Sequence, residues 1–216
     1  MATFKLSPSA LTLMNECPRC FWLTQHNVWK RPSAPFPQLP NGMDRVLKIH
    51  FDKFMRKGLL PPELKDNGDT KGMLLFDDEK LLTEWRNSRK GLWFEDDKGN
   101  VLHGGVDNIL IKEKKLIVLD YKTKGSSAKE DAHKFNQHQL DIYNFLLRSM
   151  GYKTEDYSFL LFYSPSEVLE TGEVIFHTEL RKVKTSIKDG EKLFQDAIKL
   201  LNSECPDKHC VWCDGK

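Results

Sequence analysis

The sequence predicts an α/β fold in which a central mixed sheet is flanked by helices. Residues 92 to 123 have alternating apolar and polar positions, interrupted by polar turns at 97–100 and 112–114, which is typical of β-strands. Segments on both sides of this centre carry apolar residues at three- and four-residue spacing, as amphipathic helices do. Because strands and helices alternate along the chain and the central strands are joined by short turns, we expect a mixed sheet.

The amino-terminal part is expected to be helical. Ser7 can cap free backbone amides and Pro8 is tolerated at the first helical position, so a helix should begin here and run to Cys17. Residues 31 to 40 contain four prolines, which favour an extended connector. A second helix is expected over residues 43–57, with one face made by Met43, Leu47, His50 and Phe54.

The rest of the chain supplies the sheet and its other helices. An acidic start followed by spaced apolar residues predicts a short helix over residues 77–85. Residues 92–96, 101–111 and 115–123 are expected to form one three-stranded antiparallel meander. The elements predicted after it are a helix over 132–150, strands over 158–163 and 174–183, and a last helix over 190–202.

Length and composition favour one domain over residues 1–216. The chain has 39% hydrophobic and 30% charged residues, and it lacks the run of about 18 apolar residues that a membrane span needs. The first nine residues contain no apolar signal segment, so a cytoplasmic protein is expected. The net charge is only +2, from 33 basic and 31 acidic residues. Any nucleic-acid site must therefore be a local patch.

Two carboxylates and a lysine form the first candidate site. Side chains alternate between the faces of a strand, so Asp120 and Lys122 should project together from the third meander strand. Antiparallel pairing would bring Asp107 close to Asp120. Hard divalent cations such as Mg²⁺ bind carboxylate oxygens together with phosphate and water. A lysine beside such an ion could neutralise charge that develops on a phosphate in hydrolysis.

The order of these motifs resembles that of a known family. Four elements occur in the order and approximate spacing of RecB-like nucleases of the PD-(D/E)XK superfamily: the helix of residues 42–50, Gly105-Val106-Asp107, Leu119-Asp120-Tyr121-Lys122-Thr123-Lys124, and Gln139 with Tyr143. The resemblance implies a restriction-endonuclease-like core. It also implies these metal ligands: His50, Asp107, Asp120 and the main-chain carbonyl of Tyr121. Lys122 would be the catalytic lysine, and Gln139 and Tyr143 would contact the site or the DNA.

The function that follows from the resemblance is phosphodiester hydrolysis. We expect a DNA nuclease dependent on Mg²⁺ or Mn²⁺, acting as an exonuclease on single strands or free ends. Its partners would be proteins of DNA repair, recombination or CRISPR adaptation. The alternative is a non-catalytic module that binds DNA or assembles a complex. A decayed nuclease would be expected to lose at least one of the four site residues, and this chain keeps all of them: His50, Asp107, Asp120 and Lys122.

The cysteines form a second candidate site. Two CxxC pairs, Cys17 with Cys20 and Cys210 with Cys213, could supply four thiolates to a zinc ion or an iron–sulfur cluster, with Cys205 as the alternative to one of the first pair. The chain also resembles AddB-type and CRISPR-associated RecB-like nucleases, in which cysteines that flank the nuclease domain hold a [4Fe–4S] cluster. That resemblance implies a cluster here, with Zn²⁺ as the alternative. Those relatives have one amino-terminal and three carboxyl-terminal cysteines, whereas this chain has two and three.

Overall fold

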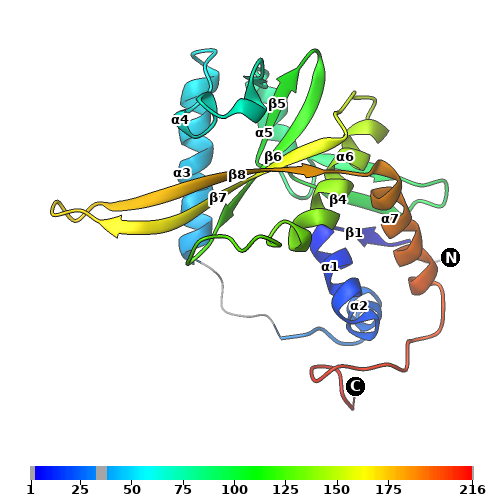
Figure 1. Ribbon diagram of the computed structural model, residues 1–216. Helices are drawn as coiled ribbons and strands as arrows, with labels where there is room; N and C mark the ends of the chain where they lie inside the picture. The colour runs from blue at the N-terminus through cyan, green and yellow to red at the C-terminus, as the bar shows by residue number, and fades with distance from the viewer. Residues whose placement is uncertain (1–2, 33–37, 216) are drawn as a thin grey trace.

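The computed structural model describes residues 3–32 and 38–215 (Figure 1). Its main sheet has five strands in the order β2-β5-β6-β7-β8. These strands are β2 (Leu74–Leu75), β5 (Asn108–Lys112), β6 (Lys115–Thr123), β7 (Tyr157–Val168) and β8 (Val174–Lys184). Only β6 and β7 pair in parallel; the other neighbours in this sheet are antiparallel. The predicted mixed sheet is confirmed.

A second sheet corrects the prediction of a single meander. It has three strands in the order β1-β4-β3, namely β1 (Lys5–Leu6), β4 (Val101–Gly104) and β3 (Leu92–Glu95). The expected strand over residues 101–111 is therefore two strands, β4 and β5, in different sheets. The break has a local cause. The Val106 amide donates to the Trp85 carbonyl at 3.1 Å, and a Cβ on Gly105 would lie 2.8 Å from the Arg86 carbonyl oxygen.

Within the described residues, the structure contains the five predicted helices and two further ones, and two of the predicted helices begin five residues from the expected position. The helices are α1 (Pro8–Glu16), α2 (Pro18–Gln25), α3 (Gln38–Met55), α4 (Pro62–Lys65), α5 (Glu79–Trp85), α6 (Gln137–Ser149) and α7 (Ile187–Leu201), with 3-10 turns η1 (Gly68–Thr70) and η2 (Lys134–Asn136). α3 begins at Gln38, so Pro40 lies in its first turn, where a missing amide donor is tolerated. α6 begins at Gln137 because the preceding residues form a 3-10 turn. The expected connector lies partly outside the described residues.

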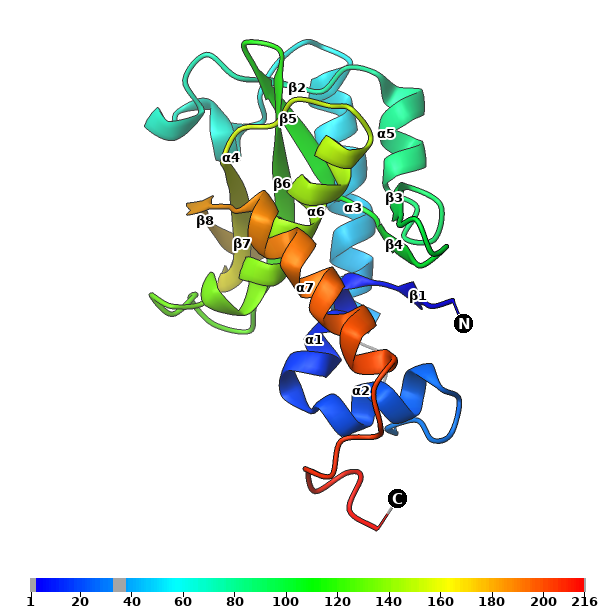
Figure 2. The same cartoon turned by 90° about the vertical axis from the view of Figure 1, so that its right-hand side faces the viewer.

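The helices lie on both faces of the main sheet, and the two views agree on this arrangement (Figures 1 and 2). On one face, the Phe51 ring of α3 lies 4.8 Å from the Tyr121 ring of β6. On the other, Lys122 of β6 reaches Gln139 of α6. One apolar cluster of buried side chains includes residues from both sheets and from most of the helices. Within the described ranges, no helix has the length and hydropathy needed to cross a bilayer.

Candidate functional site

Asp120 is a buried carboxylate in the middle of the main sheet. It lies on β6, only 2% of its surface is exposed, and its Oδ2 atom is 2.5 Å from the Lys122 ammonium. Despite this contact, no donor in the described part of the chain forms a well-directed hydrogen bond with Oδ2. Burial raises the pKa of Asp120 to about 6, the Lys122 charge opposes this rise, and the nearby Asp107 charge adds to it. A buried carboxylate oxygen that lacks a directed donor is suited to binding a cation.

Asp107 lies beside Asp120, directly before β5. The pairing of Asn108 with Leu119 continues the register toward the pair Asp107 and Asp120. The Tyr121 amide donates a 2.9 Å hydrogen bond to Asp107 Oδ2. Asp107 is thus attached to the strand that carries Asp120, which accounts for the electrostatic influence of one carboxylate on the other.

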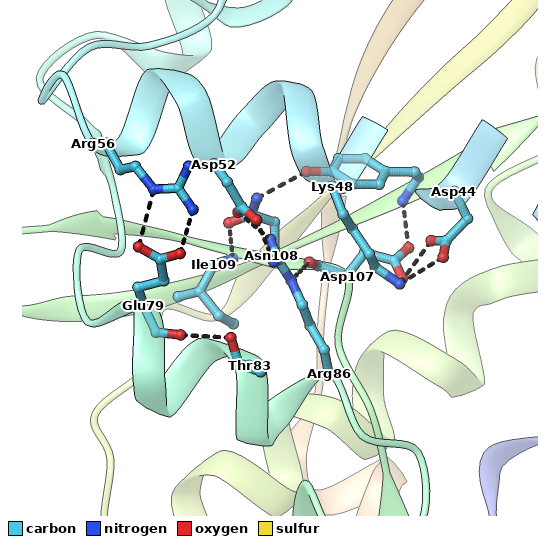
Figure 3. A network of polar contacts seen from close by, with 11 residues as sticks. Asp44, Lys48, Asp52, Arg56, Glu79, Thr83, Arg86, Asp107, Asn108 and Ile109 are labelled. Carbon is cyan, nitrogen blue, oxygen red and sulfur yellow. Dashed lines mark hydrogen bonds and ion pairs between the residues drawn. The ribbon is translucent and has the colours of Figure 1, made fainter. Parts of the chain in front are cut away.

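The main chain at Asp107 is held by an arginine from the end of α5. Arg86 Nε donates to the Asp107 carbonyl at 2.9 Å, while its two terminal nitrogens bind the Asp52 carboxylate at 2.8 and 2.9 Å (Figure 3). This bidentate ion pair is largely buried, and paired donors of this geometry fix orientation well. Arg86 therefore positions the turn between the two sheets from which the Asp107 side chain projects.

Two residues of α3, Asp44 and Lys48, join the site, and neither was predicted from the sequence. The Lys48 ammonium lies 2.8 Å from Asp44 and 3.2 Å from Asp107, so it bridges the two carboxylates (Figure 3). Burial acts to lower the pKa of Lys48, but the Asp107 and Asp44 charges outweigh it and raise the pKa. Lys48 is therefore a cation held against the predicted metal site. An acid and a lysine four residues apart are common on solvated helix faces, so sequence alone does not single them out.

Gln139 and Tyr143 extend the site into α6. Lys122 donates to Gln139 Oε1 at 3.1 Å, and Gln139 Nε2 donates to the Tyr143 hydroxyl at 2.7 Å. Tyr143 is 5% exposed and packs where Gly104 leaves space, since a Cβ there would lie 2.9 Å from the tyrosine ring. Gln139 is thus in direct contact with the predicted catalytic lysine. Tyr143 reaches that lysine only through Gln139.

His50, the fourth residue expected at this site, makes its polar contact with a residue of another helix. Its Nε2 atom contacts Glu63 at 3.1 Å, and Glu63 also accepts a 3.0 Å hydrogen bond from Tyr163. Across residues 3–32 and 38–215, the only group of three or more potential metal ligands with donor atoms within 4.8 Å of one another consists of cysteines. The other residues of the expected α3 face, Met43, Leu47 and Phe54, pack against the apolar cluster, and His50 is half-buried beside them. The role of His50 as a metal ligand therefore stays a prediction.

The raised pKa of Asp120 predicts a pH-dependent gain in stability for Asp120→Asn. The folded protein holds this proton up to about pH 6, whereas an unfolded aspartate releases it near pH 3.8. The protonated Asp120 carboxyl therefore makes its whole contribution to the free energy of unfolding at low pH, and this contribution is lost as the pH rises through that window. In the presence of chelator at pH 8, the free energy of unfolding of the variant should exceed that of the parent by up to about 2 kcal/mol. Urea unfolding at pH 8 and pH 4.5 checks this; an advantage that grows toward pH 4.5 would contradict it.

Four of the five cysteines form a separate group, to which both ends of the chain contribute. Cys205 lies outside it and accepts a 3.4 Å hydrogen bond from Arg19. A hydrogen bond from the Trp212 amide is the main interaction that lowers the pKa of Cys210 to about 6. We call the following four residues, whose sulfur atoms all lie within 4.8 Å of one another, the cysteine site: Cys17, Cys20, Cys210 and Cys213.

Comparisons with known proteins show which family this chain belongs to. The family model described as the PD-(D/E)XK nuclease superfamily matches residues 70–215, which is more than half of the chain. No curated protein matches. A solved structure described as the crystal structure of SSO0001 matches with 16% identity and a TM-score of 0.48, over 94% of this chain and 79% of that one.

The matched residues include β5, β6 and α6. They also include four residues of the candidate site, namely Asp107, Asp120, Lys122 and Gln139. The chain belongs to the PD-(D/E)XK nuclease superfamily. Membership indicates a metal-dependent nuclease, since these nucleases use divalent metal ions.

Proposed function

We propose that this protein is a single-domain DNA nuclease that hydrolyses phosphodiester bonds with Mg²⁺ or Mn²⁺ bound at Asp107 and Asp120. The observation that carries the proposal is the buried Asp120 oxygen, which lacks a directed hydrogen bond and has Lys122 and Asp107 beside it. The donor set fits a hard cation, because it offers carboxylate oxygens and the main-chain carbonyl of Tyr121. The continuous apolar cluster supports treating the chain as one domain.

The protein's own residues would divide the work between them. When bound, the ion polarises the scissile phosphate and lowers the pKa of the attacking water. Asp120 would hold it from β6, and Asp107 from the residue directly before β5. Lys122 would place a positive charge where negative charge develops on the phosphate, and Gln139 fixes the direction of the lysine by accepting a hydrogen bond from its ammonium. Tyr143 positions Gln139.

Asp44 and Lys48 give α3 a part in the same site, in addition to the ligand role expected of His50. Lys48 neutralises Asp107 and Asp44 when no cation is bound, and its ammonium would be free to bind a phosphate oxygen once a cation takes its place. In the structure His50 contacts Glu63, and it would have to leave this contact to bind the catalytic ion. We therefore propose that α3 contributes Asp44 and Lys48 together with His50.

A cleavage assay on defined DNA ends tests the proposed activity. Purified protein would be incubated with single- and double-stranded DNA, with free or blocked ends, in Mn²⁺, Mg²⁺ or chelator. An exonuclease that prefers single strands and free ends should degrade free-ended single strands fastest and leave blocked DNA intact. Binding without cleavage in either metal would instead identify a DNA-binding module. Partners in repair, recombination or CRISPR adaptation would be sought only after cleavage is established.

Substituting Lys48 with methionine should strengthen metal binding. The change removes a cation that competes for Asp107, so the apparent Kd for Mn²⁺ should fall about 3- to 10-fold, as expected for a partly buried ion pair worth about 1 kcal/mol. Calorimetric titration with Mn²⁺ measures this directly. Lys53→Met is the matched control, since Lys53 is an exposed residue of the same helix. Weaker Mn²⁺ binding by Lys48→Met than by Lys53→Met would show that Lys48 does not compete with the metal ion for Asp107.

A further inference from the structure

The sulfur atoms of the cysteine site are packed more closely than an iron–sulfur cluster allows. The Sγ–Sγ distances are 3.8 Å from Cys17 to Cys213, 3.5 Å from Cys20 to Cys210, and 3.8 Å from Cys210 to Cys213. Every pair lies within 4.8 Å. A disulfide bond needs a separation of about 2 Å, so none of these pairs is bonded. The site is a group of four free thiols around one point.

These distances match a single tetrahedral ion. With zinc–sulfur bonds of about 2.3 Å, four thiolates at the corners of a tetrahedron lie about 3.8 Å apart. In a [4Fe–4S] cluster each thiolate binds a different iron atom at an outer corner, which separates the sulfur atoms by about 6 Å. The observed group therefore has the dimensions of the first arrangement, and the cluster that the resemblance implies does not fit it.

The backbone of each CxxC pair holds its sulfur atoms in place. The Cys20 amide donates to Cys17 Sγ at 3.5 Å at the start of α2, where Cys17 is the N-cap residue. The Cys210 amide donates to Cys213 Sγ at 3.4 Å. Both bonds stabilise negative charge on sulfur, as a thiolate ligand requires. The two pairs thus offer preformed halves of one ligand set.

The surroundings keep the sulfur atoms together. Cys20 and Cys213 are fully buried, and the apolar side chains of Leu23, Trp22 and Trp29 pack around the site. Separating the sulfur atoms by a further 2 Å or so to admit a cluster would disrupt this packing. Arg31, which also pairs with Glu16 at 2.6 Å, points a guanidinium nitrogen at Cys210 Sγ from 3.9 Å. This cation offsets the net negative charge of four thiolates around a divalent ion.

We propose that the cysteine site binds one zinc ion, in place of a [4Fe–4S] cluster. Tetrahedral sites with four sulfur ligands hold zinc or iron–sulfur centres, and the sulfur–sulfur distances match the first. All four ligand positions are filled by the protein, which is typical of a structural rather than a catalytic zinc site. The zinc ion would be separate from the catalytic ion, because the two sites share no residue.

Metal analysis of the full chain tests the assignment. The protein would be produced with both iron and zinc in the medium, purified without oxygen, and analysed for metals, acid-labile sulfide and visible absorption. The expected result is one zinc per chain, no sulfide and no colour. Four irons with sulfide would overturn the proposal, as would one iron without sulfide or a protein with Cys17 and Cys20 in disulfides.

Release of the ion identifies its ligands without relying on variants that fail to fold. Titrating the parent protein with a mercurial reagent should release the zinc as four thiols react, and Cys205→Ser should release the same amount with one fewer reactive thiol overall. Cys213→Ser should bind less zinc than Cys205→Ser, which is the matched control. Loss of zinc in Cys205→Ser, or zinc that stays bound after all thiols have reacted, would contradict the proposed ligands.

Discussion

Replacing Asp120 with asparagine is expected to lower the rate of DNA cleavage by a factor on the order of 10³, since ion binding and the charge beside Lys122 are lost together. The substitution keeps the size of the side chain, and Asp120 lies within the sheet rather than on a phosphate-contact surface. DNA binding in chelator should therefore change little. Single-turnover cleavage at saturating Mn²⁺, together with a binding titration, measures both quantities.

The stability of the same variant separates a lost ligand from a damaged fold. Mn²⁺ should raise the unfolding midpoint of the parent and leave that of Asp120→Asn unchanged, because only the parent retains the full ligand set. Glu95→Gln, which changes a carboxylate of the small sheet instead, should behave as the parent. A variant that cleaves at the parental rate would show that Asp120 does not bind the catalytic ion.

Disrupting the cysteine site should cause the largest loss of stability. Cys17→Ser removes a ligand directly before α2, and Cys213→Ser removes one from the carboxyl-terminal segment. Both should lower the free energy of unfolding by an amount on the order of 5 kcal/mol. The two losses should be similar, because ion binding is also folding free energy at a shared site. Urea unfolding of the purified proteins measures them.

Cys205→Ser controls for the loss of a thiol as such. Its sulfur lies outside the cysteine site and contacts Arg19, so its loss should cost about 1 kcal/mol or less. Chelator should destabilise this variant and the parent equally, and it should leave Cys17→Ser unaffected. If Cys17→Ser and Cys205→Ser unfolded at the same urea concentration, the two CxxC pairs would not share an ion.

The features that the sequence predicted correctly depend on local periodicity. Asp120 and Lys122 share a face because strand side chains alternate, and this holds wherever the strand lies in the sheet. The CxxC pairs are likewise informative alone, since paired thiols at that spacing are typical of metal sites. The mixed sheet followed from the order of the strands and helices, whatever the details of their packing.

The features that the sequence did not predict depend on tertiary contacts. The break at Gly105 results from packing against Trp85, the last residue of α5, and Arg86, which follows it, and strand periodicity does not encode this contact. The rotation of α3 about its axis depends on which of its residues pack on β6. Because each residue turns a helix by about 100°, Lys48 and His50, two residues apart, lie on different faces. Sequence periodicity identifies the helix but not this rotation.

The connection from β6 through α6 to β7 bears on the order in which the site assembles. Asp120, Lys122 and Gln139 belong to this one unit of parallel strands and crossover helix, in which the lysine and the glutamine are only 17 residues apart. Lys48 instead comes from α3, a distant segment that contacts the sheet through its own packing. Contacts between nearby segments form before those that close long loops. The catalytic lysine and its glutamine can thus be in place early in folding, and hydrogen exchange at α3 would report a separate opening that exposes Asp107 while β6 stays protected.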